Sequence, residues 1–377
     1  MKVTHVITGL GVGGAEVMLL RLLSRTDRDQ FQPTVISLTD HGVLGEQIES
    51  LGIPVYGLGM RPNRPDPRAL GHLVRQLRRD QPDLVQTWLY HADLLGGLAA
   101  QVAGRVPIAW GVHNTNLAPA INKRGTLLVA QLCARLSAWL PTAIVYCSEA
   151  TKQAHLAIGY RPEKSVVIPN GFDLDLFRPN AAARVEVRHE LGLPIDVPLI
   201  GLVARYHPAK GHRTFVEAAR LLAACRSDVH FVLVGDGVDW ENHELAGWID
   251  ATGPRDRFHL LGRRRDAPRL QASFDLGTSS SAGESLSLVV GEAMACAVPC
   301  VVTDVGGSAY LVGDTGRVVP PGDAAALAAG WHDLLALDPA ARADLGRRAR
   351  QRIADHFGLP QIVRHYEQLY ERLAGES

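Results

Sequence analysis

The chain has 377 residues, 46% of them hydrophobic and 21% charged, which is ordinary for a globular protein and too long for one compact core. Lysine plus arginine balance aspartate plus glutamate at 39 each, so no overall field selects nucleic acid as a partner. Five cysteines without a C-x-x-C pair argue against a disulfide framework or a zinc site and favour thiols in a reducing compartment. The chain has no run of about 18 apolar residues, so we expect no membrane-spanning helix.

Short apolar runs alternate with longer stretches of helical period, which predicts mostly parallel sheets with helices on both faces. Turn residues cluster between 169 and 180 and separate two such series. We therefore expect two wound α/β domains, 1–175 and 176–358, and a helix at 359–377 that packs on its own domain or crosses back to the first. The expected strands are 3–8, 34–38, 55–58, 84–87, 108–112 and 144–147 in the first domain, and 199–204, 229–234, 258–261, 276–279, 300–303 and 317–319 in the second.

A glycine-rich loop follows the first expected strand. Gly9, Gly11 and Gly14 satisfy the pattern G-x-G-x-x-G, and Asp40 stands at the end of the next strand, as in dinucleotide-binding proteins. An NAD-dependent oxidoreductase is one function that this pattern allows. The same glycines suit a loop that passes close to a sugar diphosphate, or a tight turn that binds nothing. Because the loop also interrupts the apolar stretch that a signal peptide needs, we expect a cytoplasmic protein.

Residues 121–140 are predicted to form a helix that carries Lys123, Arg124 and Arg135 among many apolar residues. One interpretation is an amphipathic surface helix that brings the protein to lipid-linked substrates at an anionic membrane. The other is a helix packed in its own domain, and the apolar residues favour it. The core face would then consist of Leu127, Leu128, Val129, Leu132, Leu136, Trp139 and Leu140.

Two cations, Arg205 and Lys210, lie five residues apart on a loop that follows the strand expected at 199–204. Open α/β sheets bind ligands at the carboxyl ends of their strands. Arginine can bind two phosphate oxygens and lysine acts as a point charge, so the pair could offset the charge of a leaving nucleoside diphosphate. Two such cations can equally face solvent.

Two glutamates eight residues apart, Glu284 and Glu292, border a loop-to-helix segment. The small and hydroxylated residues before Leu288 suit a helix N-terminus, whose amides and positive dipole end can receive a phosphate. Glu284 is then expected just before the helix and Glu292 about two turns along it, roughly 12 Å further at about 1.5 Å per residue. The carboxylates could accept hydrogen bonds from the ribose and the hexose of a nucleotide sugar. A solvated helix with two surface acids would have the same spacing.

Taken together, these motifs and several others give a chain that resembles the retaining, nucleotide-sugar-dependent glycosyltransferases of family 4, and the resemblance runs through nearly all of it. The motifs that carry it are Gly13-Gly14-Ala15-Glu16, His113-Asn114, residues 168–173, Arg205 with Lys210-Gly211, Gly235-Asp236-Gly237, residues 284–295, Pro299 and residues 303–307. The resemblance implies the GT-B fold, in which two Rossmann-like domains face each other across a cleft. It also implies that the N-terminal domain takes the acceptor and the C-terminal domain the donor.

The resemblance further implies roles for individual residues. Arg205 and Lys210 would bind the donor diphosphate, Glu292 the ribose and Glu284 the donor sugar, while His113 would face the sugar near the reacting carbon. The implied catalytic residues are His113, Glu284, Arg205 and Lys210. The implied donor-binding residues are Gly13, Gly14, Arg205, Lys210, Arg263, Glu284, Leu288, Val289 and Glu292. Ser285 and Leu286 stand where the family commonly has glycine and an aromatic residue, and Ala297-Val298 where it commonly has glycine before the proline, so donor-sugar selectivity could differ.

The implied function is retaining transfer of a hexosyl group from a nucleoside-diphosphate sugar, such as a UDP-sugar, to a glycan or lipid-linked acceptor hydroxyl. Such a reaction would belong to cell-surface, exopolysaccharide or glycolipid biosynthesis and would need neither a metal ion nor another cofactor. The protein would act in the cytoplasm, either free or peripheral at the inner face of the membrane. A nucleotide-sugar epimerase of similar fold, an NAD-dependent oxidoreductase and a binding protein with a relict site are the rival interpretations.

Overall fold

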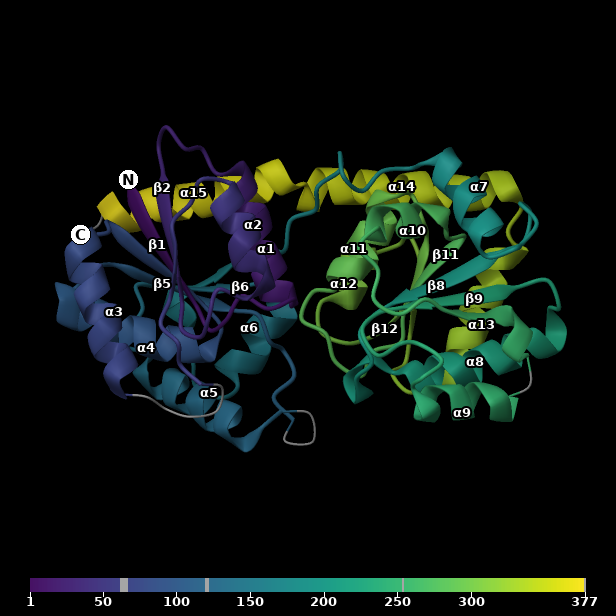
Figure 1. Ribbon diagram of the computed structural model, residues 1–377, viewed down its shortest axis with the longest axis horizontal. Helices are drawn as coiled ribbons and strands as arrows, with labels where there is room; N and C mark the ends of the chain where they lie inside the picture. Colours follow the sequence, from purple (N-terminus) through teal and green to yellow (C-terminus); the bar gives the residue numbers. More distant parts are fainter. Residues whose placement is uncertain (62–66, 119–121, 253, 376–377) are drawn as a thin grey trace. The chain divides into compact units, whose positions relative to one another are not determined.

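The chain folds into two compact units, each built on one parallel sheet. A computed structural model describes residues 1–61, 67–118, 122–252 and 254–375 (Figure 1). The first unit comprises Met1–Gly171 and Leu359–Ser377, and the second comprises Phe172–Gly358. The units therefore part a few residues before the boundary drawn from the turn cluster, and the last helix belongs to the first unit.

The sheet of the first unit has seven parallel strands in the order β3-β2-β1-β4-β5-β6-β7. The strands are β1 Lys2–Ile7, β2 Gln32–Ser37, β3 Val55–Gly57, β4 Leu84–Trp88, β5 Ile108–Val112, β6 Ala143–Tyr146 and β7 Ser165–Val167. The first six lie within two residues of the expected strands. β7 covers the apolar run before the turn cluster and pairs with β6 at the edge of the sheet.

Helices cover both faces of this sheet. They are α1 Gly14–Arg25, α2 Gly42–Ser50, α3 Pro67–Asp80, α4 Tyr90–Ala103, α5 Arg124–Leu136, α6 Glu149–Leu156 and α15 Leu359–Gly375, with a 3-10 turn η1 at Pro162–Lys164. Figure 1 shows α1, α2 and α15 on one side of the sheet and α3, α4 and α5 on the other. Among the helices of the described ranges, none combines the length and the apolar character that crossing a bilayer requires.

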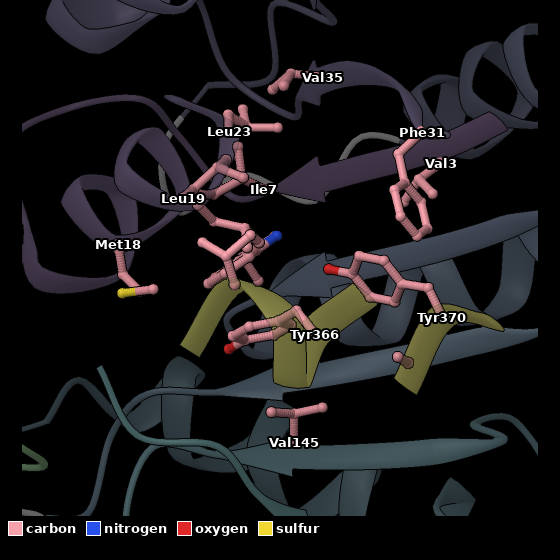
Figure 2. Close-up of a cluster of buried hydrophobic side chains, with 14 of the residues drawn as sticks. Val3, Ile7, Met18, Leu19, Leu23, Phe31, Val35, Val145, Tyr366 and Tyr370 are labelled. Atoms are coloured by element: carbon pink, nitrogen blue, oxygen red, sulfur yellow. The ribbon is translucent and has the colours of Figure 1, made fainter. Parts of the chain in front are cut away.

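Side chains along β1 alternate between two cores because successive residues of a strand point to opposite faces. Val3 and Ile7 enter the core under α1, α2 and α15, whereas Val6 enters the core under α3, α4 and α5. Figure 2 shows Tyr366 and Tyr370 of α15 within the first of these cores. The buried side chains of α15 recur every three or four positions and are Leu359, Ile362, Val363, Tyr366, Leu369, Tyr370 and Leu373. This stripe explains why the last helix belongs to the first unit.

The sheet of the second unit has six parallel strands in the order β10-β9-β8-β11-β12-β13. The strands are β8 Leu199–Val203, β9 His230–Val234, β10 Phe258–Leu260, β11 Leu276–Ser279, β12 Cys300–Thr303 and β13 Arg317–Val319. The helices are α7 Ala181–Glu190, α8 His212–Cys225, α9 His243–Thr252, α10 Ala267–Ser273, α11 Leu288–Ala295, α12 Ser308–Val312, α13 Ala324–Ala336 and α14 Pro339–Phe357, with 3-10 turns η2 Pro208–Lys210 and η3 Arg255–Arg257. The strands match the expected ones to within one residue. Phe215, Phe231 and Trp331 join α8, β9 and α13 in the core of this unit.

A buried ion cluster ties α7 to the start of the second sheet. The Arg188 guanidinium, whose side chain is 1% exposed, donates a 2.6 Å hydrogen bond to the Asp275 carboxylate. Arg184 donates to the other carboxylate oxygen at 2.8 Å, and the amide of Leu199 donates to the first at 2.8 Å. A buried charge is tolerated only when it is paired in this way.

Asp275→Ala is therefore expected to lower the free energy of unfolding by about 3 kcal/mol, because it leaves the Arg188 charge buried without its carboxylate. Urea denaturation of the whole chain measures the loss. The matched control is Asp344→Ala on α14, whose pair with Arg347 is largely exposed and should contribute less than about 1 kcal/mol. Equal losses in the two variants would contradict a structural role for the Asp275 cluster.

The interpretation of residues 121–140 as a helix packed in its own domain is correct for only part of its apolar face. Ile121 lies outside the described residues, and α5 runs from Arg124 to Leu136. Of the seven apolar residues predicted to form the core face, Leu140 is buried and Leu127, Val129 and Leu136 are half-buried. Leu128, Leu132 and Trp139 are 64%, 42% and 72% exposed, so the prediction is wrong for these three. The buried face is instead made of the small side chains Ala130, Cys133 and Ala134, which allow α5 to approach α4 closely.

Candidate active site

The strand orders place a topological switch point in each unit. In the first sheet, β1 lies between β2 and β4, so the chain leaves the carboxyl ends of β1 and β4 in opposite directions. In the second sheet, the same relation holds for β8 and β11. Ligands of open α/β sheets bind at such points. The glycine loop follows β1, the Arg205 and Lys210 loop follows β8, and the Glu284 loop follows β11, so all three lie at switch points.

The loop after β8 lies directly against the loop after β11. Gly211 has φ of 66°, and a Cβ at this position would lie 1.9 Å from the carbonyl oxygen of Ser280. The Ser280 hydroxyl donates to the carbonyl of Lys210 at 3.1 Å, and the amide of Ala282 donates to the carbonyl of Ala209 at 2.8 Å. Glycine is therefore required at 211 both by its left-handed conformation and by the close approach. These contacts hold Lys210 beside the segment that carries Glu284.

Lys210 and Glu284 form an ion pair. The Nζ of Lys210 lies 2.5 Å from Oε1 of Glu284, and the hydroxyl of Ser281 donates to the same oxygen at 2.8 Å. The Lys210 and Glu284 side chains are 27% and 12% exposed, so both retain some access to solvent. The structure thus brings together a cation suited to a phosphate and a carboxylate suited to hydroxyl groups.

The loop after β12 fixes the backbone around Glu284. Gly306 has φ of 55°, and a Cβ there would lie 1.8 Å from the carbonyl oxygen of Glu284. The amide of Gly307 donates to the carbonyl of Ser285 at 2.8 Å, and the Thr303 hydroxyl donates to the carbonyl of Ser281 at 2.6 Å. Contacts with Lys210, Ser281 and Gly306 therefore hold Glu284 in position, as preorganised sites require.

Helix α11 begins at Leu288, which is later in the chain than a position of Glu292 about two turns along the helix would require. Glu284 lies in the loop four residues before the helix, and Glu292 is the fifth helical residue, a little more than one turn from the start. The estimate of roughly 12 Å between Glu284 and Glu292 assumed a helical rise for every residue between them. That assumption is wrong, because the residues between Glu284 and Leu288 are not helical. Glu292 is 7% exposed and lies on the same side of α11 as Leu288 and Val289, whose amides belong to the first turn.

Arg263 follows a turn that contacts the β8 loop indirectly. The amide of Gly235 donates to the carbonyl of Gly262 at 2.9 Å, and a Cβ on Gly235 would lie 2.0 Å from the carbonyl oxygen of Ala204. The loops that carry Arg205 and Arg263 therefore emerge from the same edge of the second sheet. Both arginines are exposed. Of the predicted site residues, the structure brings Lys210 and Glu284 into contact. The others in the second unit follow strands that end at the same edge of the sheet or stand in α11, and they are Arg205, Arg263, Leu288, Val289 and Glu292.

The remaining predicted residues belong to the first unit. Gly13 precedes the first turn of α1, and a Cβ on it would lie 2.5 Å from Oε2 of Glu16. Gly14 is the exposed first residue of α1. The loop meets the next crossover, because the amide of Leu44 donates to the carbonyl of Leu10 at 3.0 Å. Gly13 and Gly14 thus leave the backbone at the N-terminus of α1 uncovered by Cβ atoms.

His113 follows β5 and stacks on Trp88, which ends β4. The ring centroids are 5.1 Å apart and the planes are inclined by 21°. The Trp88 indole in turn donates to Nδ1 of His5 at 3.3 Å. Burial lowers the pKa of His113 to about 4, so its imidazole is neutral near pH 7. A neutral imidazole can donate one hydrogen bond and accept another.

The imidazole of His113 is expected not to titrate between pH 8 and about 5.5, because its pKa in the folded protein is about 4. Histidine NMR signals recorded over this range, with His113 assigned from the spectrum of His113→Asn, would test this. Since the unfolded pKa is about 6.5, the neutral form stabilises the fold above that pH, and the contribution is lost as the pH falls towards 4. A midpoint near 6.5 for His113 would contradict its burial.

Three supporting residues were not predicted from the sequence. Ser281 and Thr303 orient Glu284 and its loop, and Trp88 stacks on His113. The serines at 279–281 were interpreted only as small and hydroxylated residues that suit a helix N-terminus. Their position directly after a strand was the available signal, since hydroxyl groups there can donate to a neighbouring side chain or loop carbonyl.

Within the part of the chain that the structure describes, no group of three or more histidine, cysteine, aspartate or glutamate side chains is placed to hold a metal ion. None of the five cysteines, all of which lie in the described ranges, is joined to another by a disulfide bond.

Comparisons with known proteins decide the family. The model described as Glycosyltransferase Family 4 matches residues 12–176, and the model described as Glycosyl transferases group 1 matches residues 197–336. A 2-deoxystreptamine glucosyltransferase of Streptomyces kanamyceticus is 30% identical over 326 residues, which are 82% of this chain and 82% of that relative. The chain belongs to glycosyltransferase family 4.

This glycosyltransferase is also similar to a UDP-Gal:alpha-D-GlcNAc-diphosphoundecaprenol alpha-1,3-galactosyltransferase of Escherichia coli. The two are 26% identical over 321 residues, which cover 83% of this chain and 81% of the relative. Among solved structures, the Anabaena protein HepE in complex with UDP-glucose is 26% identical, with a TM-score of 0.85 over 99% of this chain and 100% of that one.

The expected fold class is therefore confirmed: the glycosyltransferase has two parallel-sheet Rossmann-like units of the GT-B type. The prediction that it is an enzyme of the glycosyltransferase class is confirmed as well. Family membership assigns the glycine loop after β1 to a glycosyltransferase, so the dinucleotide interpretation of that loop falls away.

Proposed function

We propose that this glycosyltransferase transfers a hexosyl group from a UDP-hexose to an acceptor hydroxyl, with retention of the anomeric configuration. The observation that carries the proposal is the 2.5 Å contact between Lys210 and Glu284 at the switch point of β8 and β11. A cation for the diphosphate and a carboxylate for the sugar lie within reach of one ligand there. The UDP-glucose complex of the similar HepE protein supports UDP as the nucleotide.

The proposed donor site lies in the second unit. Arg205 and Lys210 bind the diphosphate, and the amides of Leu288 and Val289 at the start of α11 donate to its oxygens. Glu292, one turn further, accepts hydrogen bonds from the ribose hydroxyls. Arg263, exposed on the loop beyond β10, contacts the base. No metal ion is required in this proposal, because the cations and the helix end balance the diphosphate charge.

The proposed contacts of the donor sugar come from the loop after β11. Glu284 accepts hydrogen bonds from its hydroxyls, and Ser281 holds the carboxylate in place. For the first unit we propose the acceptor side, with Gly13 and Gly14 as donor-binding residues and the neutral His113 as a catalytic residue. Ser285 and Leu286 lie next to Glu284 in the chain, so they are the positions at which donor-sugar selectivity would be altered.

The proposed transfer proceeds on one face of the sugar. The bond from the anomeric carbon to the β-phosphate oxygen breaks, and its electron pair stays on the phosphate, where Arg205 and Lys210 stabilise it. The acceptor oxygen forms the new bond on the same face, and its proton passes to the departing phosphate. Retention normally uses a carboxylate nucleophile. Glu284 is assigned to the sugar hydroxyls, so a front-face route fits the site better.

We propose a glycan or lipid-linked acceptor, and a role in cell-surface, exopolysaccharide or glycolipid biosynthesis in the cytoplasm. The name of the similar Escherichia coli galactosyltransferase, which specifies a diphosphoundecaprenol acceptor, supports this choice. The five cysteines, all in the described ranges, form no disulfide bond, which fits a reducing compartment.

Removal of divalent cations is expected to leave turnover within about twofold of the untreated enzyme, because protein cations offset the diphosphate charge. Assays with and without excess EDTA measure this. A loss that added Mg²⁺ or Mn²⁺ restores would contradict the metal-free site.

The experiment that tests the proposed function is a panel of UDP-, GDP- and ADP-hexoses in thermal unfolding, followed by product analysis. A ligand at about 100 times its Kd stabilises the native state by about 2.7 kcal/mol, so UDP-hexoses should raise the Tm and the other nucleotides should not. The anomeric configuration of the product, read by NMR coupling constants, should match that of the donor. An inverted product, or release of an epimer without an acceptor, would overturn the proposal.

A further inference from the structure

One face of α5 exposes large apolar side chains between arginines. Leu128, Leu132 and Trp139 are 64%, 42% and 72% exposed, and Arg124 and Arg135 are exposed as well. Positions 124, 128, 132, 135 and 139 are spaced by three or four residues, so they share one side of the helix. Trp139 lies three residues beyond Leu136, the last residue of α5. The amides of Trp139 and Leu140 both donate to the carbonyl of Leu136 at 3.0 Å, so the chain continues in a helical turn there. We call these five residues the outer face of α5.

The outer face of α5 is not needed for the fold of its unit. The opposite side of the helix, with Ala130, Cys133 and Ala134, is the side that is buried and that belongs to the core shared with α3 and α4. Figure 1 shows α5 at the margin of the first unit, with α4 between it and the sheet. Scattered apolar side chains are common on protein surfaces, but a tryptophan and two leucines exposed on one helix face form a patch of the kind found at interaction sites.

The charges of the residues around α5 indicate which kind of partner this surface binds. Residues 94–148 contain no aspartate or glutamate, whereas they contain the cations Arg105, Lys123, Arg124 and Arg135. The chain as a whole balances acids and bases at 39 each, so this stretch is an exception to its composition. The partner therefore carries negative charge next to an apolar region.

We propose that the outer face of α5 binds the surface of an anionic lipid bilayer. Leu128, Leu132 and Trp139 would enter the boundary between headgroups and acyl chains, the depth at which tryptophan is enriched in membrane proteins. Arg124 and Arg135 would contact lipid phosphates on either side of them. A helix lying in the plane of the surface satisfies both sets of contacts at once. This inference does not rest on the proposed reaction, because it concerns a surface outside the donor site.

The test uses the full chain with vesicles of phosphatidylcholine alone and with about one third phosphatidylglycerol, in flotation assays. The wild-type protein should float with the anionic vesicles and stay behind with the neutral ones. Arg124→Gln and Arg135→Gln should each weaken binding about fivefold, because a basic residue near an anionic surface contributes about 1 kcal/mol. Leu128→Ser and Trp139→Ala should each weaken it about tenfold, as expected for the loss of a buried apolar side chain.

Matched controls come from the second unit. Leu176→Ser removes a leucine that is 56% exposed, and Arg220→Gln removes an exposed cation of α8, so neither should change vesicle binding. The tryptophan emission of the wild type should shift to the blue on binding, and that shift should be absent in Trp139→Phe. Three results would overturn the proposal: no flotation of the wild type, equal losses in the control variants, or self-association without vesicles that Trp139→Ala abolishes, which would make this face a contact between copies of the chain.

Discussion

Lys210→Ala is expected to lower kcat for donor turnover by roughly 100- to 1,000-fold, the cost of removing one preorganised charge from a developing anion. The expectation follows from the position of Nζ, which the Gly211 and Ser280 contacts hold beside Glu284 at the β8–β11 switch point. The substitution removes one partner of a partly exposed ion pair, so the Tm should change by only a few degrees. Steady-state assays with a UDP-hexose, alongside thermal melts, measure both quantities.

Arg213→Ala is the matched control for Lys210→Ala. Arg213 stands three residues further along the chain in α8, and its pair with Glu217 is exposed, so its loss should leave kcat unchanged. Lys210→Arg keeps the charge and should recover part of the activity. If Lys210→Ala retained more than about a tenth of the wild-type kcat, the assigned role would be wrong.

Glu292→Ala is expected to lower kcat/KM for the donor roughly 100-fold, because it removes charge-assisted hydrogen bonds to the ribose, each contributing about 1.5–3 kcal/mol. The position in α11 supports this role, since Glu292 stands one turn after the helix start to which the diphosphate is assigned. Isothermal titration with UDP and with 2′,3′-dideoxy-UDP separates the role from a structural one. The wild type should prefer UDP strongly, and the variant should bind the two nucleotides equally.

A merely structural role of Glu292 would weaken both nucleotides alike and leave the preference for UDP intact. That outcome would contradict the assignment. Glu217→Ala, which removes an exposed carboxylate of α8, should keep the wild-type preference and serves as the control.

Much of the fold follows from local patterns. Val3, Val6 and Ile7 alternate between two cores as the period of a strand requires, so β1 could be located within one residue. The apolar stripe of α15 was equally clear, but it did not show against which of the two sheets the helix packs. A helical period reveals that one face is buried but not the partner against which it is buried.

The helix α5 shows where a pattern misleads. Leu128, Leu132 and Trp139 were predicted to be buried because of their size, but the side buried against the unit consists of alanines and a cysteine. Small residues allow close approach of two helices, and that preference is invisible when apolar residues are counted by bulk.

The functional residues of the candidate site could likewise be predicted only in part. Lys210 and Glu284 are 74 residues apart in sequence, and only the family resemblance joined them before the structure did. Ser281 and Thr303 donate the hydrogen bonds that orient Glu284 and its loop. Their positions depend on the approach of the β11 and β12 loops, which no local pattern encodes. The expectation that Glu292 lies about two turns along the helix was wrong, because small residues before a helix resemble its first turn and α11 begins only at Leu288.

The most direct test of the central claim is hydrogen–deuterium exchange of the full chain with and without UDP. The claim is that the nucleotide binds the second unit where the β8 loop, the β11 loop and the start of α11 meet. We expect slower exchange on UDP binding in peptides covering residues 205–211 and 284–292. Tight binding of UDP with unchanged exchange in both of these segments would contradict it.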